Sequence, residues 1–170
     1  EAIAAGDSDE RKSLAASARQ TIICATSHMV GRSATTGTRA NLFKLSDARD
    51  LMALEPNGFF GRGDKSTRVF RPGERTFDDV IANNVRWVPS VQDESDLDAT
   101  GLPYQTFLVH PVSIGEDHVH GALTVDCLNQ GDLVEDIDTP MMAVLSTLIA
   151  ITYECEKYPN PRRATSNRVT

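Results

Sequence analysis

Histidines and carboxylates near one predicted hairpin are the residues of this chain best spaced to bind a metal. His118 and His120 are two positions apart in an extended segment, so both imidazoles would lie on one face of a strand, as in many zinc sites. A hairpin could bring His110 to the same face, with Asp117 or Asp126 as a carboxylate. The spacing fixes no fourth ligand, so we expect no metal and keep His118 and His120 as the alternative.

The cysteines indicate a reduced protein. The chain has an odd number of cysteines, which are widely spaced and form no C-x-x-C pair: Cys24, Cys127 and Cys155. That pattern is not a disulfide framework, so we expect three free thiols in a cytoplasmic protein. No Ser-His-Asp or Glu-x-x-His arrangement has supporting local sequence, so an enzyme is the weaker class of function.

The charges of the chain are unevenly distributed. The net charge of −7 argues against a nucleic-acid partner, because phosphate binding needs an excess of basic residues. Residues 87–156 contain 13 acidic residues and no Lys or Arg. Four of the acids, Asp93, Glu94, Asp96 and Asp98, lie within six residues, and their repulsion should keep that loop mobile. Such a negative field favours a cationic or neutral ligand over a phosphate.

A long helix is predicted over residues 8–31, from Ser8, a good N-cap, to Gly31, a natural stop. Its apolar residues recur every three or four positions and form one narrow stripe: Leu14, Ala18, Ile22, Ala25 and Met29. A stripe so narrow and rich in alanine suits contact with a second copy of the chain. We therefore predict a homodimer through the terminal helices, with Leu14, Ile22 and Met29 in the contact, alongside Leu145, Leu148 and Thr152 of the last helix. No apolar run is long enough to span a bilayer, so we expect no membrane insertion.

The remaining pattern predicts an α+β domain over residues 8–157, followed by a polar, disordered tail over 158–170. Short strands are expected within 39–45, 51–54 and 67–70, then a short helix within 74–84 and a strand over 85–88. Strands 104–114 and 118–127 form a hairpin, and a last helix starts at Thr139 with Pro140 in its first position. The strands form a central antiparallel sheet of five to six strands, flanked by the N- and C-terminal helices and the short middle helix.

The two faces of the second hairpin strand are predicted from its alternation. Val119, Gly121, Leu123 and Val125 would cover the helices, whereas His118, His120, Ala122, Thr124 and Asp126 would form a mixed face. Pro111 within a strand needs an edge or a bulge, and Gly121 permits a close backbone approach, which we expect against Pro111.

Three stretches of this order carry a resemblance to a known family. They are Tyr104-Gln-Thr-Phe-Leu-Val-His-Pro-Val, then His120-Gly-Ala-Leu-Thr-Val-Asp-Cys, then Asp136-Ile-Asp-Thr-Pro-Met-Met-Ala-Val-Leu-Ser-Thr-Leu-Ile-Ala. Together with Arg39-Ala-Asn-Leu-Phe upstream, they resemble the GAF domain family of small-molecule and redox sensors over roughly residues 10–157. The pattern is one of apolar positions, so it speaks for the fold more than for the function.

The resemblance implies a non-catalytic sensory domain of a bacterial-type signalling protein. Such a domain would bind a small ligand or a partner and relay the change through its terminal helices. We expect the pocket between residues 85–104 and the mixed face of the hairpin, with Trp87 or Tyr104 as an apolar wall. Thr106, Thr124 and Asp126 would supply hydrogen bonds. The identity of any cofactor is left open.

Two alternatives remain. Some members of the family reduce free methionine sulfoxide with paired cysteines, and Cys127 is the candidate nucleophile for such an enzyme. The family's cysteines in the loop before the hairpin are missing, because residues 89–105 contain none. The other alternative is a pure interaction or dimerisation module with a collapsed pocket.

Overall fold

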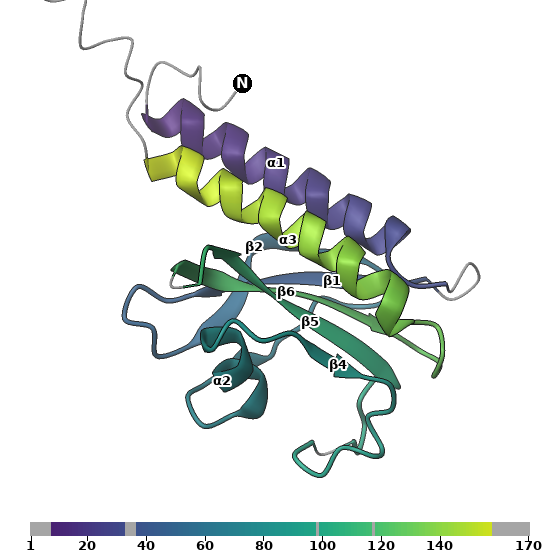
Figure 1. Cartoon of the computed structure of the whole chain (residues 1–170). Coiled ribbons are helices and arrows are strands. Elements are labelled where there is room, and N and C mark those ends of the chain that lie inside the picture. Colours follow the sequence, from purple (N-terminus) through teal and green to yellow (C-terminus); the bar gives the residue numbers. More distant parts are fainter. Residues whose placement is uncertain (1–7, 33–36, 98, 117, 158–170) are drawn as a thin grey trace, which may run out of the picture.

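A six-stranded antiparallel sheet separates two long helices on one face from a short helix and several loops on the other (Figure 1). The computed structural model describes residues 8–32, 37–97, 99–116 and 118–157. The strand order is β3-β2-β1-β6-β5-β4. The strands are β1 (Arg39–Leu45), β2 (Met52–Gly61), β3 (Val69–Phe70), β4 (Arg86–Val88), β5 (Thr106–Ile114) and β6 (His118–Cys127). The predicted α+β class with a central antiparallel sheet is confirmed.

The two long helices, α1 (Ser8–Met29) and α3 (Glu135–Lys157), lie side by side over one face of the sheet (Figure 1). The buried residues of α1 are Arg11, Ala15, Arg19, Ile23 and Thr26. They form the row next to the predicted stripe. The stripe itself is half-buried, except for Met29, which is 53% exposed. Leu14, Ile22 and Met29 therefore do not form the main contact of α1 with its own domain.

Helix α3 begins four residues before the predicted start at Thr139, which places Pro140 inside the helix and not at its first position. The cause is the buried carboxylate of Asp138. Its Oδ2 accepts the backbone N–H of Val134 at 2.6 Å, and its Oδ1 accepts that of Gly31 at 3.0 Å. One side chain thereby accepts a free backbone N–H at the start of α3 and connects that helix to the residue after α1. None of the described helices is long and apolar enough to cross a bilayer.

The sheet has an apolar core on each face. Leu42, Leu108, Leu123 and Val125 pack under α1 and α3, whereas Phe43, Phe107 and Val109 pack toward α2 (Arg75–Ile81). Strand β2 runs to Gly61, well beyond the predicted end at 54, since its pairing with β1 shifts register between Asn41 and Phe43 and then continues.

A bulge between β5 and β6 reverses the predicted faces at the start of β6. Val112 pairs with Gly121, but Ser113 pairs with Val119, so His120 is the extra residue. Val119 consequently packs in the core toward α2, and the His120 ring stacks on Tyr153 of α3 at a centroid distance of 5.0 Å. The prediction is wrong for Val119, His118 and His120. Beyond the bulge, Leu123 and Val125 face the helices as expected.

Candidate ligand-binding site

A cavity of about 50 Å³ lies between the sheet and the segment that contains β3 and α2. That volume suits a few waters or a small ligand. Strands β1, β5 and β6 form its floor, and aromatic rings of Phe43, Phe70, Tyr104 and Phe107 form much of its wall. The polar residues that line it are Arg39, Asn41, Ser66, Arg68, Thr76, Thr124 and Asp126. Apolar walls with a few directed polar groups are the usual make-up of a small-molecule site.

Asp126 lies at one end of the cavity and holds two arginines. Arg39 Nε donates to Asp126 Oδ2 at 2.8 Å, and Arg62 Nη2 donates to Oδ1. All three side chains are largely buried. Burial raises the pKa of the Asp126 carboxyl, while the attraction of Arg39 and Arg62 opposes that shift. Because both carboxylate oxygens are engaged, Asp126 positions the arginines.

Asn41, on the cavity floor, has an unsatisfied acceptor. The residue is 2% exposed, and its Nδ2 donates to Thr124 Oγ1 at 3.4 Å. Its Oδ1 is buried without a hydrogen-bond partner in the described part of the chain. A buried carbonyl left unpaired costs about 1–3 kcal/mol. A ligand that brings an N–H or O–H group to this oxygen would recover that energy.

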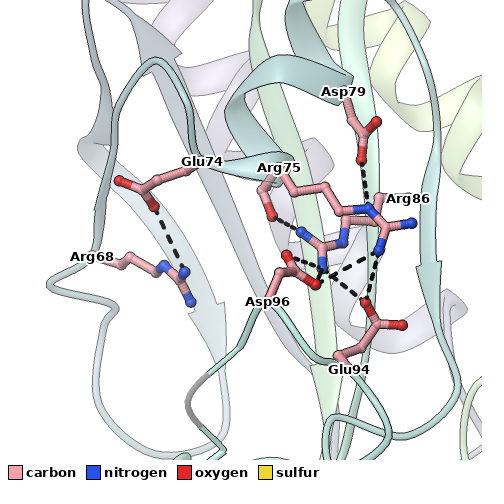
Figure 2. A network of polar contacts seen from close by, with 8 residues as sticks. Arg68, Glu74, Arg75, Asp79, Arg86, Glu94 and Asp96 are labelled. Carbon is pink, nitrogen blue, oxygen red and sulfur yellow. Dashed lines mark hydrogen bonds and ion pairs between the residues drawn. The ribbon is translucent and has the colours of Figure 1, made fainter.

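Arg68 and Tyr104 also line the cavity, and the Arg39 guanidinium lies 5.5 Å from the Tyr104 ring centroid. The Arg68 guanidinium lies 4.8 Å from the Phe70 ring centroid, and its Nη2 is 3.7 Å from Glu74 Oε2, a long ion pair drawn in Figure 2. Burial raises the pKa of the Tyr104 hydroxyl. Arg68 is about one-third exposed, so its charge remains available to a ligand at the cavity rim.

The acidic loop, described over residues 89–97 and 99–102, is held beside this site by arginines that pair with Glu94 and Asp96 (Figure 2). Arg86 Nη2 lies 3.0 Å from Glu94 Oε2 and 2.8 Å from Asp96 Oδ2, and Arg75 reaches the same two carboxylates. Burial raises the pKa of Asp96, but the hydrogen bond and charge of Arg86 outweigh it, so that pKa is lowered. The premise of unbalanced repulsion is therefore wrong for Glu94 and Asp96. Asp98 lies outside the described residues.

The structure brings Tyr104, Thr124 and Asp126 together in the cavity wall, but not Trp87 or Thr106. Trp87 packs against the core under α1 and α3, and Thr106 is buried with its Oγ1 donating to the carbonyl of Val88 at 2.8 Å. Both side chains fall on the helix-facing side of their strands, since strand residues alternate.

Sequence reasoning missed five polar residues of the cavity: Arg39, Asn41, Ser66, Arg68 and Thr76. A signal for two of them was present in β1, where Arg39, Asn41 and Phe43 alternate with Ala40 and Leu42. Polar residues at alternate positions of a buried strand indicate a face with partners of its own. Arg68 and Thr76 carried no comparable signal.

The histidine pair lies on the other side of the sheet, away from the cavity. Lys157 Nζ is 3.2 Å from His118 Nε2, and His120 Nε2 is 3.1 Å from Glu154 Oε1. Burial lowers the pKa of His120, as does the charge of Lys157. Within the described ranges, no three His, Cys, Asp or Glu side chains are grouped to hold a metal ion.

Cys127, the candidate nucleophile of the redox alternative, is fully buried under the helices beside Thr38. Burial raises the pKa of its thiol to about 11. Only the thiolate is nucleophilic, so at neutral pH its reactive fraction should be about 100-fold below that of an ordinary cysteine. The geometry does not provide an activated thiol at this position.

We expect iodoacetamide at pH 7.5 to label Cys24 and Cys155 long before Cys127, because both are only half-buried on their helices. Peptide mass spectrometry over time measures the three rates in one native sample, and urea-unfolded protein gives the reference rate for each site. Preferential labelling of Cys127 in the native protein would contradict its assignment as a buried structural thiol.

Several solved structures have the same fold as this chain at low sequence identity. The chain is similar to a solved structure of a GAF domain at 16% identity and a TM-score of 0.56, over 67% of this chain and 63% of that one. It is similar to the GAF domain of the cyanobacteriochrome TePixJ at 10% identity and a TM-score of 0.64, over 92% and 95%. It is also similar to the type II free methionine-R-sulfoxide reductase of Thermoplasma acidophilum at 16% identity and a TM-score of 0.63, over 83% and 93%.

The chain therefore has the GAF fold, as the resemblance in its sequence implied. No family model matches the sequence, and no curated protein is detectably similar to it. A GAF sensor protein of Burkholderia vietnamiensis and methionine sulfoxide reductases both occur among its structural neighbours, so the fold alone does not choose between these functions.

Proposed function

We propose that this protein is a non-catalytic sensory module that binds a small polar ligand in the cavity and relays binding to its terminal helices. The observation that carries the proposal is the buried, unpaired Oδ1 of Asn41 on the cavity floor. Native proteins leave few buried acceptors unsatisfied, and this one faces a cavity. A hydrogen-bond donor on a bound ligand would pair with this oxygen.

The lining indicates the chemistry of that ligand. It should donate a hydrogen bond to Asn41, present a flat or apolar body to the aromatic walls and carry a neutral or anionic group toward Arg68. The cation-favouring field expected from the sequence does not act here. Arg39, Arg62 and Arg68 outnumber the acids that they contact, namely Asp126 and Glu74, and the acidic loop is paired with other arginines.

A buried polar cluster supports the relay. Glu55 of β2 accepts a hydrogen bond from Arg19 of α1 at 3.0 Å and another from the Tyr153 hydroxyl of α3. Arg19 Nη2 also lies 2.7 Å from Glu156 of α3. Strand β2 pairs with β1, which carries Asn41, so a shift of β1 on ligand binding would act on both helices through one carboxylate.

The exposed helix surface supports the proposed homodimer. Beside the partly exposed stripe of α1, α3 presents Val144, Leu148 and Ile151, each 45% exposed or more. Leu145 and Thr152, which the sequence placed in the same contact, are buried within the domain, so only Leu148 of the three predicted α3 residues is free to make it. Apolar residues on two adjacent helices suit an interface with a second copy. Three free cysteines support a cytoplasmic setting within a signalling protein. The buried, high-pKa Cys127 disfavours the redox-enzyme alternative, and the polar cavity disfavours a pure interaction module.

A melting screen against small hydroxy acids, amino acids, nucleobases and nucleotides tests the ligand site. A ligand at 100 times its Kd should add about 2.7 kcal/mol to the free energy of unfolding. Asn41→Leu, which keeps the branched shape of the side chain but has no acceptor, should lose that gain. Asn84→Leu, on the exposed surface beyond α2, should keep it. A ligand that stabilises Asn41→Leu as well as the wild type would contradict the proposed site, as would a screen without any hit.

A further inference from the structure

Arg75 and Arg86 converge beside the cavity on two carboxylates of the acidic loop (Figure 2). The Arg86 side chain is only 3% exposed. Its Nη1 donates to Thr76 Oγ1 at 2.8 Å, whereas Nη2 lies within 3.0 Å of three oxygens, Glu94 Oε2 and both Asp96 oxygens. Arg75 Nη1 adds contacts at 3.3 Å to Glu94 and 3.6 Å to Asp96.

These carboxylates match the Arg86 guanidinium poorly. All three oxygens crowd one nitrogen, while Nε of the same group is buried and has no hydrogen-bond partner. A guanidinium binds an oxyanion best through two parallel N–H groups, such as Nε and Nη2 together. The two carboxylates of the loop therefore neutralise the charge of Arg86, but they do not bind its Nε and Nη2 together, which is the geometry that a guanidinium prefers.

The arginine pair adjoins the cavity. Thr76, which accepts the Arg86 hydrogen bond, lines the cavity wall, and the Arg86 guanidinium lies 5.4 Å from the ring centroid of Phe107, which also lines it. An anionic group on a molecule bound in the cavity would meet Thr76 first and Arg86 directly behind it.

We propose that Arg75, Thr76 and Arg86 form a binding site for a tetrahedral oxyanion, and that Glu94 and Asp96 hold this site in the ligand-free protein. The proposal deepens the proposed function, on which it rests for its ligand. A tetrahedral oxyanion engages Nε and Nη2 of Arg86 together and leaves further oxygens for Arg75 and the Thr76 hydroxyl. Its binding displaces the two carboxylates and releases the acidic loop, so that occupancy becomes a change in loop order.

The double variant Glu94→Gln/Asp96→Asn tests this, because it removes the competing charge and keeps the side-chain shapes. Inorganic phosphate is titrated at constant ionic strength, with chloride as the balancing anion, and affinity is measured by calorimetry and melting. The double variant should bind phosphate at least about 10-fold more tightly than the wild type, which corresponds to about 1.4 kcal/mol. Adding Arg86→Gln should abolish the gain. Asp93→Asn, an exposed acid of the same loop, should behave as the wild type.

A folded double variant whose phosphate affinity equals that of the wild type overturns the proposal and leaves the network with a structural role only. If the double variant does not fold, the single variant Glu94→Gln, which leaves Asp96 on Arg86, must still bind phosphate more tightly than the wild type, by a smaller factor. An unchanged phosphate affinity in that variant also overturns the proposal. Phosphate binding that survives Asn41→Leu separates this site from the cavity floor. The proposed ligand at Asn41 can then fail while the oxyanion site stands, or the reverse.

Discussion

Replacing Asp126 by alanine should lower the free energy of unfolding by about 3–5 kcal/mol, because it leaves the buried arginines Arg39 and Arg62 without their shared carboxylate. Both guanidinium groups would then repel each other in a site from which water is largely excluded. Urea denaturation followed by circular dichroism measures the loss. That loss is a large share of the total, since whole domains are stable by only about 5–15 kcal/mol.

Asp93→Ala is the matched control for this experiment. Its carboxylate is exposed, so its removal should change the stability by no more than about 0.5 kcal/mol. The double variant Arg39→Met/Asp126→Leu removes two charges together and leaves only Arg62 without its carboxylate. It should cost less than Asp126→Ala alone if unpaired charge causes the loss. A loss below about 1 kcal/mol for Asp126→Ala would show that water reaches the arginines and that the cavity end is open.

Gly121→Ala should cost about 3 kcal/mol or more and prevent normal pairing of the two central strands. A Cβ on Gly121 would lie 2.0 Å from the carbonyl oxygen of Phe43 in β1, and the φ of +155° is one that L residues rarely adopt. The obstruction is backbone, so no side chain can move to relieve it. The urea midpoint and the yield of soluble protein measure the effect.

Gly131→Ala provides the control, since its Cβ would meet nothing within 4 Å and only the positive φ of +82° opposes it. That change should cost about 1–2 kcal/mol. Equal losses for the two variants would show that the strain of the dihedral angle, and not the contact with Phe43, decides the requirement for glycine. The sequence predicted a close approach at Gly121 but placed it against Pro111; the neighbour is Phe43, because β1 inserts between β2 and β6.

The sequence determined the elements whose signals are local. Helix 8–31 agrees with α1 to within two residues at its end, because Ser8 and Gly31 mark its ends. The hairpin of β5 and β6 follows from two β-rich runs joined by a short turn, and it has the predicted bounds to within two residues. The class of the fold followed from the order of these elements.

The tertiary structure alone decided which faces are buried. Arg19 lies on the buried face of α1 because Glu55 of β2 and Glu156 of α3 pair with it, and no reading of apolar spacing assigns an arginine to a core. The bulge at His120 likewise depends on how β5 and β6 are paired, and a one-residue shift exchanges the two faces of a strand.

Part of the candidate site could be predicted from the sequence, and part only from the tertiary structure. Tyr104, Thr124 and Asp126 were found because they sit in or beside strands with clear alternation. The charges of the acidic loop read as unbalanced along the chain, since their partners Arg75 and Arg86 precede that run of acids and reach it only by folding. Electrostatic interactions depend on distance in space and not on distance along the chain. The sequence therefore shows which residues are charged, and only the fold shows which of these charges are neutralised by a partner.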